Sequence, residues 1–206
     1  RKMEMIRVFG TRWIPFEKEL EGCTEDAKGF GLHGAPWVQD ANTGELVFQD
    51  CEVPKENLMG KEGDGMTVAI RDIVECGRPG MAAVGLGILN AVLVEAVKFA
   101  NERVLFGKPI SKLQAIQWYI AEIYSDLEIA KLLAYRVGWM RDQGMSVDAA
   151  APLAKHWICE AAARSARKAI EIHGSYGIMK EYPVQRLLRD ALVAIPAGGT
   201  AEIVKL

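Results

Sequence analysis

Two long helical patterns meet at the segment Asn-Glu-Arg-Val-Leu-Phe-Gly-Lys-Pro-Ile, residues 101–110, and this corner constrains the fold more than any other part of the chain. Gly107 and Pro109 suit a tight turn between two helices. Arg103 and Phe106 lie at the turn with few charges nearby. Because a guanidinium presents a rigid fork of donors that matches a phosphate or pyrophosphate, the corner is suited to hold a dinucleotide between helices.

Helical periodicity continues on both sides of the corner. After Ser111, which we expect to cap the next helix, apolar residues recur at spacings of three, four and seven until Gly144 ends the pattern. The buried side of the preceding helix is expected at Met81, Val84, Ile88, Val92 and Phe99. The expected helices are a short one ending at Asp72 and four more over residues 76–104, 111–144, 146–171 and 182–191. Long helices joined by tight corners predict a mainly α fold, an antiparallel up-down bundle.

The first part of the chain has a different composition. Residues 1–60 are rich in Gly, Trp, Pro and β-formers. Leu46-Val47-Phe48 and Val53-Pro54 indicate a strand that ends at a proline. We therefore expect a partial β-domain over residues 1–60, followed by a helical bundle domain over 61–206.

Four motifs follow one another in a recognisable order. They are Leu46–Pro54 continuing to Gly60; Arg103-x-x-Phe106-Gly107-Lys108-Pro109-Ile110 with Gln114; Ile172–Gly177 with Glu181-Tyr182-Pro183 and Arg189-Asp190; and Gly198–Ile203. Together they resemble the acyl-CoA dehydrogenases, a family of flavoenzymes, from about Leu46 to the end of the chain. The resemblance implies a C-terminal portion of a longer enzyme, comprising the end of the middle β-domain and the helical domain.

The resemblance also implies a cofactor and partners. The cofactor would be FAD, the substrate an acyl-CoA and the electron acceptor an electron-transfer flavoprotein or similar protein. The reaction would be α,β-dehydrogenation at the CH-CH bond of the acyl group. The protein would form a homo-oligomer, a tetramer or a dimer.

Cofactor-binding roles are carried over to three groups of residues. At the corner the matching residues are Arg103, Phe106 and Gln114. At the end of the pattern over residues 146–171 they are Glu171, Gly174 and Ser175, although the family usually has Gln and Gly where this chain has Glu171 and Ser175. In the last loop they are Thr200 and Glu202.

Five of these residues also have a structural interpretation. Arg103 could form an ion pair with Glu102, Phe106 could fill the core, and Gln114 could be solvated. Gly174 could simply end a helix. Thr200 caps the final helix in either case.

The catalytic base requires separate treatment. The family removes the α-proton with a glutamate, placed in most members at the position of Gly198 and in another branch at that of Gly77. Three alternatives remain: Glu75 is the base, the base lies outside this chain, or the dehydrogenase step has been lost. Glu75 precedes Gly77 by two residues, and side chains at that spacing on a helix point about 200° apart. This geometry disfavours Glu75 as a direct substitute for a glutamate at position 77.

The residues beside these positions have substrate roles by resemblance. Arg78, Gly198 and Gly199 would lie near the acyl thioester. The competing interpretation of Arg78 is an ion pair with Glu75 or Asp72.

Composition excludes several other classes of protein. A net charge of -2 gives no reason to expect nucleic acid or an anionic membrane, and we find no apolar run near the ~18 residues of a membrane span. The four cysteines are scattered and only three histidines occur, so we expect no metal site or disulfide framework and a reducing compartment: the cytoplasm, or the mitochondrial matrix in a eukaryote. Two alternatives to the dehydrogenase are a non-catalytic subunit or scaffold and a flavin monooxygenase on the same fold.

Overall fold

The computed structural model describes residues 5–7 and 52–205, with side chains from residue 54 onward. The chain divides into two compact units, residues 1–69 and 70–206, and each is described by itself. In the first unit, β1 (Met5–Arg7) pairs antiparallel with β2 (Glu52–Pro54), and Ile6 lies opposite Val53. The strand predicted at Val53-Pro54 is therefore confirmed, whereas Leu46-Val47-Phe48 lies outside the described residues.

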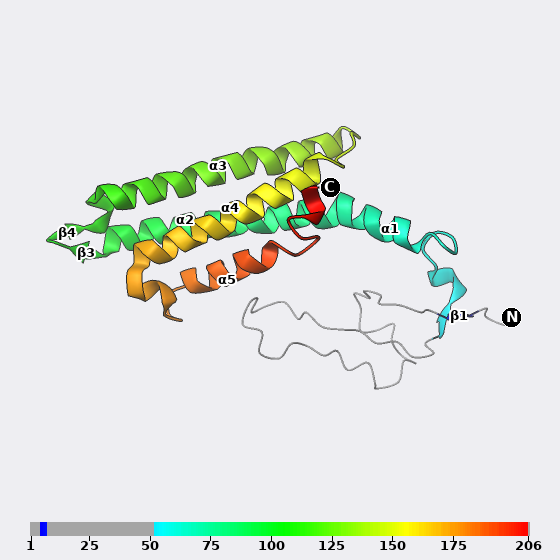
Figure 1. Ribbon diagram of the computed structural model, residues 1–206, viewed down its shortest axis with the longest axis horizontal. Coiled ribbons are helices and arrows are strands. Elements are labelled where there is room, and N and C mark those ends of the chain that lie inside the picture. Colours follow the sequence, from blue (N-terminus) through cyan, green and yellow to red (C-terminus); the bar gives the residue numbers. More distant parts are fainter. Residues whose placement is uncertain (1–4, 8–51, 206) are drawn as a thin grey trace. The chain divides into compact units, whose positions relative to one another are not determined.

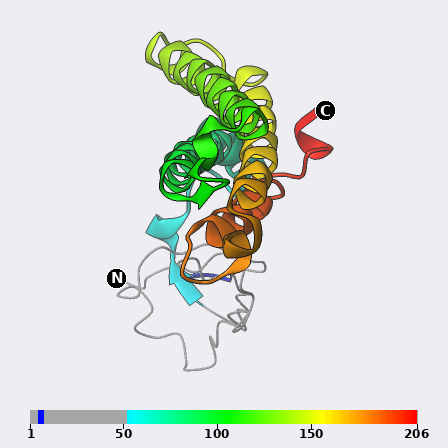
Figure 2. The same cartoon turned by 90° about the vertical axis from the view of Figure 1, so that its left-hand side faces the viewer.

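The second unit is a helical bundle, as predicted. Its helices are α2 (Arg78–Glu102), α3 (Gln114–Asp142), α4 (Ala150–His173) and α5 (Val184–Ala194), and their directions alternate along the chain (Figure 1). A short helix, α1 (Gly65–Asp72), and a π-helical turn (Ile73–Gly77) precede α2 without a break. Viewed from the end, α2 and α4 form the centre, with α3 on one side and α5 on the other (Figure 2).

Small residues bring the two central helices together. A Cβ added to Gly85 on α2 would lie 3.0 Å from a methyl carbon of Ile158 on α4, so a larger residue there would push the helices apart. The buried face of α4 is rich in alanine, including Ala154, Ala161, Ala162, Ala166 and Ala169. Close backbone approach of this kind gives the dense packing that stabilises protein interiors.

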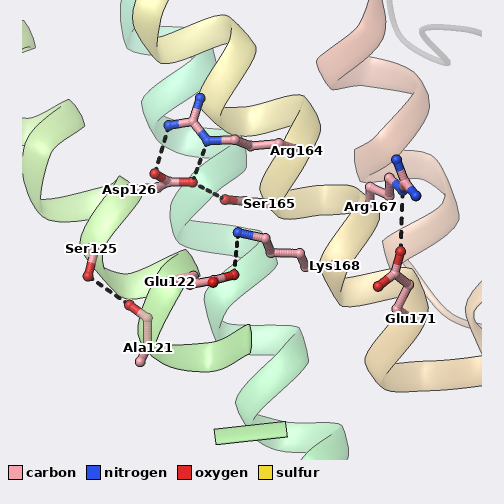
Figure 3. A network of polar contacts seen from close by, with 9 residues as sticks. All are labelled: Ala121, Glu122, Ser125, Asp126, Arg164, Ser165, Arg167, Lys168 and Glu171. Atoms are coloured by element: carbon pink, nitrogen blue, oxygen red, sulfur yellow. Dashed lines mark hydrogen bonds and ion pairs between the residues drawn. The ribbon is translucent and has the colours of Figure 1, made fainter. Parts of the chain in front are cut away.

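Polar side chains link α3 to α4 beside this apolar core. Arg164 donates two hydrogen bonds to the carboxylate of Asp126, at 2.9 and 2.7 Å, and Ser165 donates a third at 2.8 Å (Figure 3). Lys168 pairs with Glu122 at 2.6 Å one turn further along the same two helices (Figure 3). Because Asp126 is buried, its three donors offset the cost of removing the charge from water.

Three details of the sequence interpretation were wrong. Ser111 does not cap α3: it lies in a 3-10 turn (Ile110–Lys112), and its carbonyl oxygen accepts a hydrogen bond from the Gln117 side chain at 3.0 Å. The helix predicted over residues 146–171 begins at Ala150, because the hydroxyl of Ser146 bonds to Asp148 in a local turn before it. Val84 is half exposed, because the buried stripe of α2 passes through Ala82, Gly85 and Leu89 at that level.

The expectation about apolar runs also needs correction. By length and composition alone, the continuous helical stretch Gly65–Glu102 contains a window apolar enough to cross a membrane. Core helices of bundles give the same signal, and α2 buries one face against its neighbours in the second unit.

Candidate functional site

The corner between α2 and α3 is a small β-hairpin rather than a bare helix-helix turn. Strands β3 (Val104–Leu105) and β4 (Lys108–Pro109) pair antiparallel, and the two residues between them have positive φ: 53° for Phe106 and 77° for Gly107. This combination is typical of a tight two-residue hairpin turn. The turn presents the Phe106 side chain to solvent, 90% exposed, which excludes the alternative that this ring fills the core of the bundle.

Arg103 connects this hairpin to a second predicted motif. Its backbone N–H donates to the Phe99 carbonyl at 2.9 Å and ends α2. Its guanidinium lies over the ring of Tyr176, 5.2 Å from the centroid, and in the described part of the chain no ion pair joins it to Glu102. The corner and the turn after α4 therefore meet at one end of the bundle.

The turn after α4 depends on two glycines. Gly174 ends the helix with φ 60°, and the following 3-10 turn (Gly174–Ile178) keeps Gly174 and Ser175 exposed. A Cβ on Gly177 would lie only 2.8 Å from the Ile170 carbonyl oxygen, so this position requires glycine. The turn consequently offers exposed backbone beside Arg103.

Two other predicted residues lie on the helices near this end. Gln114, the first residue of α3, is exposed, in agreement with its solvated interpretation. Glu171 is exposed on α4, pairs with Arg167 at 3.3 Å, and accepts a hydrogen bond from Tyr119 that raises the pKa of that phenol. We call Arg103, Phe106, Gln114, Glu171, Gly174 and Ser175 the corner cluster.

A second group of predicted residues lies where α2 begins. The segment after α5 turns through Gly198 and Gly199, with φ of 71° and 115°. A Cβ on Gly198 would lie 3.6 Å from the Met81 side chain and 3.9 Å from the carbonyl oxygen of Gly77. The two glycines at the family's alternative glutamate positions are therefore neighbours in space.

Thr200 caps the turn that follows, as predicted. Its hydroxyl accepts from the backbone N–H of Ile203 at 3.5 Å, at the start of a 3-10 turn (Ile203–Lys205). The carboxyl of Glu202 has a lowered pKa, because its own backbone N–H and the Thr200 hydroxyl stabilise the charged form. We call Arg78, Gly198, Gly199, Thr200 and Glu202 the turn cluster.

The charged residues at the start of α2 have different partners. Glu75 pairs with Arg71 at 2.7 Å on its own helical stretch, and its backbone oxygen accepts from Arg141. This pairing agrees with a structural role for Glu75. Arg78 has a buried Nε with no hydrogen-bond partner among the described residues, and there no ion pair joins it to Glu75 or Asp72.

One polar residue of this region was missed by the sequence interpretation. Lys155 on α4 is 1% exposed, and its ammonium donates to the carbonyl oxygens of Gly199, at 2.7 Å, and Ile195. Burial, followed by the nearby charge of Arg78, lowers the pKa of Lys155. The spacing along the sequence could have predicted this burial, because Lys155 lies four residues after Ala151 and four before Cys159, both on the buried face of α4.

The two clusters lie at opposite ends of α2. This helix has 25 residues, and at 1.5 Å per residue it is about 37 Å long. Among the described residues, no group of three or more His, Cys, Asp or Glu side chains could hold a metal ion.

The fold and these clusters define a helical-bundle domain with polar turns at both ends of its central helix. The family model described as acyl-CoA dehydrogenase, C-terminal domain, matches residues 63–206, and the chain belongs to the acyl-CoA dehydrogenase family.

Individual relatives agree. An acyl-CoA dehydrogenase of Bacillus subtilis is 42% identical over 192 residues, which cover 92% of this chain and 49% of that protein. Butyryl-CoA dehydrogenase from Megasphaera elsdenii superposes with a TM-score of 0.77 at 39% identity, covering 80% of this chain and 43% of that one. A chain in a structure of the electron transferring flavoprotein of Acidaminococcus fermentans has the same identity, score and coverage. The chain thus spans about half the length of the relatives it matches.

Proposed function

We propose that this chain is the C-terminal portion of an FAD-dependent oxidoreductase that acts on the CH-CH bond beside the thioester of an acyl-CoA. The observation that carries the proposal is the family membership, since relatives over the same residues are named acyl-CoA and butyryl-CoA dehydrogenases. We also propose that residues 1–60 belong to a partial β-domain and 61–206 to the helical domain.

The exposed groups of the chain are compatible with FAD. In the corner cluster, Arg103 would bind phosphate, the exposed Phe106 would contact the adenine, and the amides near Gly174 and Ser175 are open to a ligand. Gln114 and Glu171 would contribute side-chain hydrogen bonds. When bound, FAD would accept the hydride from the β-carbon of the acyl group.

The separation of the clusters bears on how FAD would be held. Thr200 and Glu202 lie near the start of α2, about 37 Å along that helix from Arg103, farther than one extended dinucleotide reaches. One copy of the chain therefore would not hold a single FAD through both clusters. We propose that the corner cluster of one copy and the turn cluster of a second copy bind the same FAD.

An exposed apolar face on α3 supports self-association. Large side chains on this face are 44–73% exposed: Trp118, Tyr124, Ile129, Leu132, Tyr135 and Trp139. Apolar patches of this kind on a folded domain are typical of protein interfaces.

We propose that the protein forms a homo-oligomer, either a dimer or a tetramer. Its mass would be measured by light scattering, and a monomer at micromolar concentration would contradict the proposal.

The base that removes the α-proton remains the open step of the reaction. Gly77 and Gly198 carry no carboxylate, and Glu75 is paired with Arg71. We propose that in an active enzyme the base comes from residues outside this chain, with Arg78, Gly198 and Gly199 near the thioester. The two glycines also favour a second candidate function, a non-catalytic subunit that keeps the fold and pairs with an active homologue.

Partners and location follow from the same proposal. The electron acceptor would be an electron-transfer flavoprotein or similar protein, and a reducing compartment such as the bacterial cytoplasm or mitochondrial matrix suits the scattered cysteines.

The proposal is tested on the full-length protein, by measuring its flavin content and its turnover of an acyl-CoA. Bound flavin together with reduction of an acceptor by an acyl-CoA supports the dehydrogenase. Absence of turnover together with co-purification of a homologue supports the non-catalytic subunit, and a colourless protein that cannot be reconstituted with FAD contradicts the dehydrogenase.

A further inference from the structure

The turn through Gly198 and Gly199 is held in place by a buried lysine from another helix. Lys155 extends from α4, and its ammonium donates to Gly199 O at 2.7 Å and to Ile195 O. Ile195 follows the last residue of α5, where helix carbonyls lack intrahelical partners. A single side chain therefore satisfies an oxygen before the turn and another within it.

The charge of Lys155 makes this contact hard to break. The side chain is 1% exposed and has no carboxylate within ion-pair distance in the described chain, so the carbonyl oxygens are its recorded acceptors. An ammonium that loses its acceptors inside a protein carries a large desolvation cost. Movement of the turn away from α4 would leave the charge unsatisfied, so the lysine and the turn hold one another in place.

The same face of α4 fixes the turn relative to α2. One helical turn after Lys155, the buried thiol of Cys159 lies 3.6 Å from the Met81 carbonyl oxygen. Burial raises the pKa of Cys159 to about 11, so it stays a neutral donor at ordinary pH. Met81 in turn faces Gly198, since a Cβ there would lie 3.6 Å from the Met81 side chain. α4 thus sets the distance between the start of α2 and the turn.

We propose that Lys155 is a positioning residue that holds the Gly198–Gly199 turn against the start of α2. This role rests on the proposed function, in which the turn contacts the acyl thioester. Lys155 acts through the turn and contacts no reacting atom. Its removal should loosen the turn while the bundle stays folded.

The first test is hydrogen exchange of the protein. Lys155→Met removes both hydrogen bonds and keeps the length of the side chain, and it should raise exchange of backbone amides in residues 195–204 about tenfold or more. Exchange in the centre of α2 and α4 should stay unchanged. Lys155→Arg, which keeps the charge and the donors, should restore at least part of the protection. The matched control is Lys168→Met, which removes another α4 lysine and its ion pair with Glu122 on α3, and it should leave the turn protected.

The second test uses the FAD-loaded full-length protein. In samples fully loaded with FAD, Lys155→Met should reduce the change in flavin absorbance on adding an acyl-CoA, and Lys155→Arg should recover part of the change. Unaltered exchange at the turn in Lys155→Met, or an equal loss of protection throughout α2 and α4, would overturn the positioning role. A wild-type protein without flavin would contradict the proposed function and leave the exchange test of Lys155 intact. If Lys155→Met does not fold, Lys155→Gln takes its place in both tests.

Discussion

Gly77 and Gly198 are neighbours: a Cβ built on Gly198 would lie 3.9 Å from the carbonyl oxygen of Gly77. By resemblance, family members place their catalytic glutamate at one position or the other. In this chain, therefore, both positions lie together at the start of α2, and neither supplies a carboxylate. The two positions differ in backbone conformation, which gives them different tolerances for a new side chain.

Gly77→Glu should be neutral or stabilising, whereas Gly198→Glu should destabilise the protein. Gly77 has helical φ and ψ of -65° and -48°, and an added Cβ would meet only the Asp72 oxygen at 3.9 Å, so replacing this glycine should gain about 0.5–1 kcal/mol. Gly198 has φ of 71°, and a non-glycine residue there should cost about 1–2 kcal/mol. Urea unfolding of the two variants measures the difference. Equal stability of the two variants would contradict the assigned backbone conformations.

Gly77→Glu should also introduce proton-transfer chemistry if the proposed function holds. The new carboxylate would start beside the turn, at the position used by one branch of the family. In the FAD-loaded full-length protein we expect faster exchange of the acyl-CoA α-proton with deuterated solvent, measured by NMR or mass spectrometry. Gly77→Gln has similar size and no base, so it should exchange at the wild-type rate. Equal rates in the Glu and Gln variants would show that the acyl α-carbon lies elsewhere.

Sequence periodicity predicted the bundle because its signals are local. The apolar residues that recur after Ser111, from Leu113 to Ala134, face the core, and the glycines at 144 and 174 end their helices with positive φ, as their sequence positions indicated. Cap chemistry was harder to predict. Ser111 and Ser146 both precede helices and both are common capping residues, yet each participates in a local turn instead.

The candidate site was less predictable, because its key relationships join distant parts of the chain. Nothing local to Arg103 indicates that Tyr176 will lie under its guanidinium. Lys155 resembles an ordinary solvated lysine until the loop after α5 is placed over it. The pairing of Glu75 with Arg71 lies within one helix at i,i+4 spacing and could have been predicted from sequence.

Asp126→Ala should destabilise the bundle by about 1–3 kcal/mol, because Arg164 and Ser165 lose a buried acceptor. Part of the Arg164 side chain remains in water, which limits the loss. Glu128→Ala is the matched control on the same helix: its pair with Lys131 is half exposed, and its removal should change stability by about 0.2–1 kcal/mol. Chemical unfolding compares the two. A loss no greater than that of the control would show that the network in Figure 3 does not stabilise the fold.

His173 should make the bundle less stable in mild acid. Its ring is 3% exposed and stacks on Phe99, with centroids 4.1 Å apart, and burial lowers its pKa below the ordinary 6.5. The folded protein therefore binds this proton more weakly than the unfolded chain. The free energy of unfolding should fall as the pH drops through about 6.5 and stop falling, for this group, below the lowered folded pKa.

The measurement is the urea midpoint at a series of pH values between about 7.5 and 5. His173→Phe keeps the stacked ring, removes the titrating group and should flatten this part of the profile. His156→Gln provides the control, since His156 lies near the start of the same helix and is not among the rings that pack around Phe99. A wild-type slope in His173→Phe would assign the acid sensitivity to other groups.

Arg103→Ala and Thr200→Ala should each reduce the FAD content of the full-length protein, but a mixed oligomer of the two variants should recover part of it. If the corner cluster of one copy and the turn cluster of another bind the same FAD, each two-copy assembly has two such sites. In a mixed pair, both substitutions fall in one site and the second site is intact. If both residues served an FAD within one copy, every site in the mixture would carry one defect.

The measurement uses differently tagged variants that are co-expressed and purified through both tags. Under the two-copy arrangement, this mixture should bind more flavin per chain than either variant alone. Arg136→Ala, an exposed change on α3, should leave flavin content unchanged. Absence of any gain in the doubly purified mixture would place the whole FAD site outside these two clusters or within a single copy.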